Sequence, residues 1–137
     1  MSDPKALEGG CLCGAQRFRV RLPALDAGWC HCRLCQKNAG AAAQAYAWFP
    51  REAVEWVTGS PVVYRSSARG ERLSCPACGS PLAFRDAEGW SVNAASLDDP
   101  AQVPPRRHIW TMSRLPWFDP HDGLPRFRDG GDTPDES

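Results

Sequence analysis

The sequence predicts one mostly β domain of short antiparallel strands, and three observations support this fold class. The chain has 137 residues, which is the usual length of a single domain. Its 12 glycines and 13 prolines favour turns and short strands over long helices. Apolar and polar residues alternate over short segments, as they do in half-buried strands. We expect the domain to span residues 9–127, with flexible termini over 1–8 and 128–137.

The clearest strand covers residues 16–22. Phe18, Val20 and Leu22 alternate there with three arginines, so one face is apolar and the other is charged. A helical turn is expected over 33–40, ended by Gly40. The remaining expected elements are strands over 41–49, 52–57, 61–66, 72–74, 81–85 and 90–94, a loop over 97–105 and a last short strand over 108–111.

Charge and hydropathy exclude several classes of partner. Sixteen basic residues balance sixteen acidic ones, so no net field attracts nucleic acid or an anionic membrane. No apolar run approaches the roughly 18 residues needed to span a bilayer. The first residues lack the basic and then apolar order of a signal peptide, which favours a cytoplasmic protein. Composition leaves the oligomeric state open.

Seven cysteines fall into three tight groups: Cys11 with Cys13; Cys30, Cys32 and Cys35; and Cys75 with Cys78. In a cytosolic chain, such groups bind metal more often than they form disulfides, and the odd number argues against a closed disulfide set. Cysteines two apart in an extended segment place both sulfurs on one face. The segment from Cys75 to Gly79 has the form of a zinc knuckle, in which a proline and a glycine shape the turn.

Seven thiolates divide into a site of four and a site of three. Four cysteines make a closed structural zinc site, whereas three leave a coordination position open. Because Cys30, Cys32 and Cys35 can close on one another through a local turn, the four-ligand site would comprise Cys11, Cys13, Cys75 and Cys78. The alternative joins Cys32 and Cys35 to the Cys75 pair and leaves Cys11, Cys13 and Cys30; locality favours the first partition.

His31 lies between two of these cysteines. As a zinc ligand it would close the three-cysteine site, but in an extended segment its ring points away from its neighbours. We therefore expect a packing or supporting role for it. For His108 and His121 we expect surface or packing roles.

The sequence resembles the glutathione-dependent formaldehyde-activating enzyme family, which also includes a centromere-associated protein. The resemblance rests on motifs that occur in the same order from about Gly9 to Phe127. They are Gly9-Gly10-Cys11-x-Cys13-Gly14, Cys30-His31-Cys32-x-x-Cys35, Gly59-Ser60-Pro61-x-x-Tyr64-x-Ser66-Ser67, Arg72-x-x-Cys75-Pro76-x-Cys78-Gly79-Ser80 and Val92-Asn93-x-x-x-Leu97-Asp98.

The resemblance implies a Mss4-like zinc-binding β fold with two zinc ions. It implies a structural zinc on Cys11, Cys13, Cys75 and Cys78, and a catalytic zinc on Cys30, Cys32 and Cys35. The implied activity is that of a carbon–sulfur lyase or synthase, similar to S-(hydroxymethyl)glutathione synthase, which joins the thiol of glutathione to formaldehyde.

Two other functions stay open at this stage. One is a non-enzymatic, zinc-stabilised binding module; the other is hydrolysis by zinc-bound water, which we rank last because the sequence offers no base near the cysteines. Arg17, Arg33 and Arg69 are candidates for holding the carboxylates of a glutathione-type thiol. The sequence assigns no general acid or base.

Overall fold

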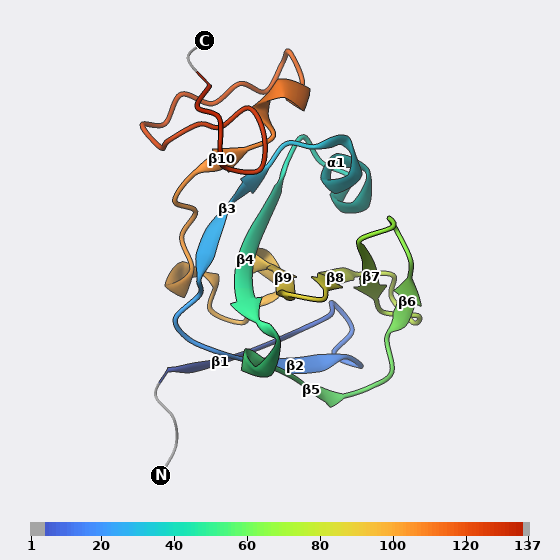
Figure 1. The fold of residues 1–137 in the computed structure, drawn as a ribbon. Helices are drawn as coiled ribbons and strands as arrows, with labels where there is room; N and C mark the ends of the chain where they lie inside the picture. The colour runs from blue at the N-terminus through green and yellow to red at the C-terminus, as the bar shows by residue number, and fades with distance from the viewer. Residues whose placement is uncertain (1–4, 136–137) are drawn as a thin grey trace.

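Two β-sheets, packed face to face, form the body of the protein in the computed structural model, which describes residues 5–135 (Figure 1). The smaller sheet has the order β1-β2-β5, and the larger has the order β10-β3-β4-β9-β8-β7-β6. Every pairing is antiparallel except that of β10 with β3. The strands are β1 (Ala6–Gly10), β2 (Arg17–Arg21), β3 (Asp26–Cys30), β4 (Gln44–Pro50), β5 (Val54–Thr58), β6 (Val62–Tyr64), β7 (Gly70–Ser74), β8 (Pro81–Asp86), β9 (Gly89–Asn93) and β10 (His108–Ile109).

Within residues 5–135, helical structure is limited to short segments. The α-helix, α1 (Arg33–Ala39), begins after Cys32, whose sulfur accepts a hydrogen bond from the backbone of Cys35. It ends at Gly40, which adopts the left-handed conformation that glycine tolerates best. Four single turns of 3-10 helix cover Arg51–Ala53, Ala94–Ser96, Pro100–Gln102 and Thr111–Ser113. In the part of the chain described, no helix is long and apolar enough to cross a membrane.

The main core lies between the two sheets. Phe18 and Val20 of β2 face Phe49 of β4 and Val92 of β9, and none of the four is more than 1% exposed. Because side chains alternate along a strand, the residues between these core positions project from the opposite face of the larger sheet. That second face carries the functional residues described below.

The structure confirms the mostly β fold class and several of its expected elements. The strand with alternating arginines is β2, and the helical turn over 33–40 is α1. Other strands are shorter than expected: the segment 41–49 becomes extended only at Gln44, since Gly40 and the following alanines complete the turn after α1. The segment 52–57 begins with a 3-10 turn, and the strand over 108–111 ends at Ile109.

Two strands and part of each terminus differ from expectation. Sequence patterning does not predict β1 or β3, because glycine and alanine interrupt the alternation in both. Part of the expected flexible N-terminus belongs to β1, which begins at Ala6. Part of the expected C-terminal tail folds into a turn in which Asp129 accepts backbone hydrogen bonds, and Phe127 bridges to Pro134. Residues 1–4 and 136–137 of those termini lie outside the described range.

Candidate metal centres

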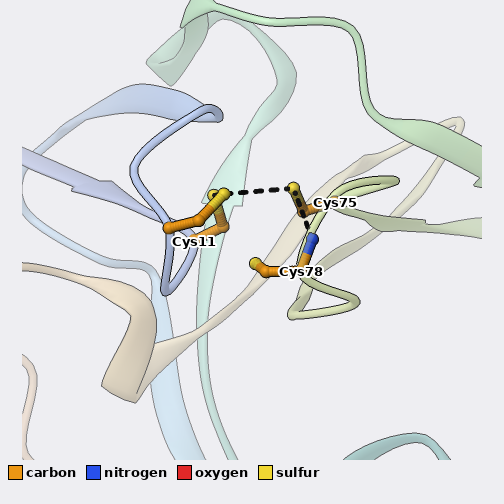
Figure 2. Close-up of side chains that lie close together, drawn as sticks. Cys11, Cys75 and Cys78 are labelled. Atoms are coloured by element: carbon orange, nitrogen blue, oxygen red, sulfur yellow. Dashed lines mark hydrogen bonds between the residues drawn. The ribbon is translucent and has the colours of Figure 1, made fainter.

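Cys11, Cys13, Cys75 and Cys78 form the first cluster, called here the four-cysteine cluster. Two turns supply it: the β1–β2 connection carries Cys11 and Cys13, and the β7–β8 connection carries Cys75 and Cys78. Figure 2 shows sulfur atoms from these turns facing one another. All four sulfurs lie within 4.8 Å of one another. The cluster therefore ties the smaller sheet to the larger one.

The sulfur separations in this cluster suit a tetrahedral metal site. A zinc ion with Zn–S bonds of about 2.3 Å needs sulfurs about 3.8 Å apart. The Cys11–Cys13 separation is 3.6 Å and the Cys13–Cys75 separation is 3.8 Å. Backbone N–H groups donate to the sulfurs: Gln16 to Cys11 at 3.2 Å and Ala77 to Cys75 at 3.3 Å. These donors stabilise thiolates, the form that binds metal.

Cys30, Cys32 and Cys35 form the second cluster, called here the three-cysteine cluster. Cys30 ends β3, Cys32 precedes α1, and Cys35 lies in the first turn of that helix. Their sulfurs also lie within 4.8 Å of one another, and the Cys30–Cys32 pair is 3.3 Å apart. The four- and three-cysteine clusters agree with the partition that locality favours. The alternative grouping of Cys32 and Cys35 with the Cys75 pair is not found among the described residues.

The three sulfurs share charge unequally. Hydrogen bonds from Cys30 and Cys35 lower the pKa of the Cys32 thiol to about 2, whereas the contact with Cys32 raises the pKa of Cys30. The guanidinium of Arg72 lies 3.9 Å from the sulfur of Cys35 and adds a positive charge at the edge of the cluster. Without a metal, thiolate character is therefore concentrated on Cys32, because the pKa values of Cys30 and Cys35 are both raised. A divalent cation would require all three cysteines as thiolates.

A cavity of about 810 Å³ opens beside the three-cysteine cluster, and all three of its cysteines line this cavity. The floor is the second face of the larger sheet. Alternate residues of neighbouring strands reach it, and the pairing register places them side by side. They are Asp26 and Cys30 of β3, Gln44, Tyr46 and Trp48 of β4, Ser91 of β9, Phe84 and Asp86 of β8 and Arg72 of β7. The four-cysteine cluster does not line this cavity, so the two clusters differ in their access to a ligand.

One wall of the cavity holds a fixed polar group. The Tyr46 hydroxyl donates to Asp26 at 2.8 Å, and Arg107 donates to the same carboxylate at 2.6 Å. Burial and the neighbouring carboxylate raise the pKa of Tyr46, so its hydroxyl stays protonated. Gly28 makes room for it, since a Cβ atom there would lie 2.9 Å from the Tyr46 hydroxyl oxygen. Tyr46 also packs with Cys30 and Cys35.

The opposite wall carries two arginines, of which Arg69 pairs with Asp86 at 3.6 Å. Arg72 and Arg69 both lie over the ring of Phe84, at 5.3 and 5.7 Å from its centroid. Ser66 lines the same part of the cavity, and its buried hydroxyl has no hydrogen-bond partner within residues 5–135. An unpartnered buried hydroxyl in a cavity that arginines also line is suited to an anionic group of a ligand.

The structure separates the arginines that the sequence suggested as carboxylate ligands. Arg69 lines the cavity. Arg17 instead pairs with Asp98 at 2.5 Å, and Arg33 donates to the side chain of Gln36. Sequence analysis did not identify four other polar residues that line the cavity, namely Asp26, Tyr46, Arg72 and Arg107. The signal for Tyr46 was present, since Gln44, Tyr46 and Trp48 alternate with core residues along β4, whereas Arg107 reaches the cavity only through tertiary folding.

The histidines lie in positions of the kind expected: His31 and His108 are buried in the packing, and His121 is at the surface. His31 is fully buried, stands outside the three-cysteine cluster and contacts His108, which is also buried. Burial, followed by the proximity of His108, lowers the pKa of His31 to about 4, so its ring is neutral at pH 7. His121 is exposed and lies 3.5 Å from Asp119.

Comparison with known proteins matches this architecture to one family. The sequence pattern of the glutathione-dependent formaldehyde-activating enzyme family matches residues 6–113, which is most of the chain. The chain belongs to this family. A Halomonas elongata protein that carries the same family name is 30% identical over 125 residues, covering 82% of this chain and 80% of that protein.

Solved structures support the fold of this family member. The crystal structure of a Rhodobacter sphaeroides protein matches with a TM-score of 0.60 at 25% identity. The match covers 73% of the present chain and 93% of the other. As a member of the formaldehyde-activating enzyme family, the protein is related to enzymes of glutathione and formaldehyde chemistry, and its two cysteine clusters can bind metal ions.

Proposed function

We propose that this protein catalyses the reversible addition of a glutathione-type thiol to a small aldehyde at the three-cysteine cluster. The observation that carries the proposal is the position of that cluster in the wall of a cavity large enough for a tripeptide, while the four-cysteine cluster lies elsewhere. In this proposal the four-cysteine cluster holds a structural zinc ion. The three-cysteine cluster holds the catalytic zinc ion.

The zinc ion would supply one kind of chemistry. Cys30, Cys32 and Cys35 would hold it, and with three protein thiolates as ligands it would accept a further sulfur and favour the thiolate, which is the nucleophilic form of a thiol. Three thiolates also donate strongly to the metal, so we assign polarisation of the aldehyde to side chains of the chain instead.

Two groups of side chains then orient the substrates. Arg72, Arg69 and the hydroxyl of Ser66 are placed to bind a carboxylate of the thiol. Arg107 and Tyr46 can donate hydrogen bonds to the aldehyde oxygen. The single O–H of Tyr46 donates to Asp26 in the free protein, so on substrate binding it would turn from this carboxylate, which Arg107 still pairs, to the aldehyde oxygen. As the carbon–sulfur bond forms, the π electron pair of the carbonyl moves to this oxygen. The proton released by the thiol ends on the same oxygen, and the reverse reaction restores both substrates.

The test is the rate of S-(hydroxymethyl)glutathione formation from glutathione and formaldehyde, measured above the uncatalysed background. We expect the wild-type protein to accelerate the reaction and Cys32→Ser to abolish the acceleration, with the loss of one zinc per chain. Tyr46→Phe should lower the catalysed rate by roughly 10²-fold, because it removes one donor to the developing negative charge.

The control for Tyr46→Phe is Tyr64→Phe, which removes the same hydroxyl from the chain's other tyrosine, exposed on β6. It should leave the rate unchanged. A wild-type protein that binds two zinc ions and takes up glutathione without accelerating the reaction would refute the proposal. A protein that binds zinc but no thiol would instead favour the non-enzymatic binding module.

A further inference from the structure

His31 lies between two cysteines of the three-cysteine cluster and is fixed at three points. Its backbone N–H donates to Ile109 at 3.0 Å, which joins the segment to β10. Its backbone carbonyl accepts a hydrogen bond from the side chain of Gln36 at 2.6 Å, and Gln36 also donates to the carbonyl of Ser113. The third point is the imidazole ring, which is fully buried and contacts His108.

The ring of His31 begins a buried chain of hydrogen bonds. Its Nε2 atom lies 2.9 Å from Nδ1 of His108, and Nε2 of His108 lies 3.0 Å from the carboxylate of Asp122. The two histidines are 0% and 1% exposed, whereas the side chain of Asp122 is 40% exposed. The chain therefore runs from the metal-binding segment to an anionic group at the surface.

The two ends of this chain indicate the direction of its hydrogen bonds. Asp122 accepts from Nε2 of His108. Nδ1 of His108 and Nε2 of His31 share the next hydrogen bond, in which one atom donates and the other accepts. The remaining Nδ1 atom of His31 is buried and lacks a partner among residues 5–135, and an unpaired lone pair there is less costly than an unpaired N–H, so His31 donates from Nε2. Without Asp122, the ring of His108 would no longer be held at its Nε2 atom.

We propose that Asp122 is a positioning residue for the three-cysteine metal centre and acts on it through His108 and His31. By fixing the ring of His31, it holds Cys30 and Cys32 at the spacing that a metal ion needs. The proposal rests on the proposed function in one respect, that the cluster binds zinc. Asp122 lies beyond residue 113, where the family pattern ends, so this part of the centre is supplied by a segment outside the matched region.

Local structure makes Asp122 a suitable anchor. Its Oδ1 atom accepts the backbone N–H of Leu124 at 3.1 Å, which fixes the side chain within its loop. The backbone N–H of His108 donates to Pro125, and Phe127 donates back to His108, so the loop is joined to β10 on both sides. Phe118 stacks on His31 with ring centroids 6.0 Å apart and closes the same cluster of rings.

The test measures zinc dissociation constants by competition with a chromophoric chelator in four variants. Cys32→Ser identifies which constant belongs to the three-cysteine cluster. Asp122→Ala should raise the zinc dissociation constant of the three-cysteine cluster by about 10- to 100-fold, as expected for a group that supports metal ligands from outside. The dissociation constant of the four-cysteine cluster should not change. Asp122→Asn should retain the wild-type zinc affinity of this cluster, because the amide oxygen can still accept a hydrogen bond from His108. Asp132→Ala removes an exposed carboxylate from the same part of the chain and should have no effect.

Three results would overturn the inference while leaving the proposed function intact. Unchanged zinc affinity in Asp122→Ala would show that the anchor does not act on the centre. Equal weakening of both constants would show a general loss of structure, which thermal unfolding of the same variants would reveal. Failure of Asp122→Asn to retain zinc affinity would exclude the acceptor role. Binding of only one zinc by the wild-type protein would instead refute the proposed function, and the inference with it.

Discussion

A serine substitution in the four-cysteine cluster should mainly lower stability, whereas one in the three-cysteine cluster should mainly lower activity. Cys13 and Cys75 are 62 residues apart, and closing a loop of that length in the unfolded chain costs about 4 kcal/mol. Cys30 and Cys35 are five residues apart in the sequence, for which the same relation gives about 2 kcal/mol. The unfolded chain therefore competes better for a metal at the three-cysteine cluster.

The difference, about 2 kcal/mol, is extra stabilisation of the folded state by the four-cysteine cluster. For a protein of this size it corresponds to a difference of about 4–8 °C in Tm. With zinc present, Cys75→Ser should unfold at a temperature lower than Cys32→Ser by about this amount. Cys32→Ser should abolish the reaction that Cys75→Ser partly retains below its Tm.

Differential scanning calorimetry at matched zinc concentration measures the first effect, and the glutathione and formaldehyde assay measures the second. Zinc content of each variant, determined by elemental analysis, confirms that one site has been lost in each. Equal destabilisation by the two substitutions, or greater destabilisation by Cys32→Ser, would refute the assignment of the structural role to the four-cysteine cluster.

Further predictions concern the cavity and the surface of the smaller sheet. Arg72→Gln should weaken glutathione binding by roughly tenfold, because a charged hydrogen bond is lost, while leaving binding of an uncharged thiol such as 2-mercaptoethanol unchanged in calorimetric titrations. Gly28→Ala should cost about 1–3 kcal/mol in chemical denaturation and also lower activity, since the added Cβ would lie 2.9 Å from the Tyr46 hydroxyl oxygen; an active and stable variant would contradict the packing described. Arg17 holds the pKa of Asp98 below its usual range, so the pair's contribution to stability is present above about pH 4 and is lost as pH falls through the lowered value. Asp98→Asn should therefore be less stable than wild type at pH 7, and the two should converge in acid unfolding experiments.

The cysteine clusters could be anticipated because their determinants are local in sequence. The spacing of Cys30, Cys32 and Cys35 needs only one strand end and one helical turn to bring the sulfurs together, and the structure contains both. Once these three cysteines are assigned to one site, the four that remain are Cys11, Cys13, Cys75 and Cys78. This is why the second site could be predicted although its two halves are distant in sequence. Strand β2 was equally clear, because its alternation is uninterrupted.

The cavity could not be anticipated from one segment. Its floor depends on the register of five neighbouring strands, and one of these, β3, lacks a recognisable pattern because Ala27 and Gly28 separate its functional residues. Asp26 belongs to the polar group of the cavity because it pairs with Arg107, which lies 81 residues away in the sequence. The link from Asp122 to His31 could not be predicted either, because it runs through His108 and depends on contacts between segments that are distant in sequence.

The most direct test of the account is the number of sulfurs bound to zinc before and after glutathione is added. X-ray absorption at the zinc edge reports this number for the protein in solution. We predict two zinc ions sharing the seven cysteine sulfurs in the free protein, and an eighth sulfur after addition of glutathione, with loss of the one non-sulfur ligand. An unchanged sulfur number at saturating glutathione would contradict the claim that the three-cysteine cluster is an open centre for a thiol.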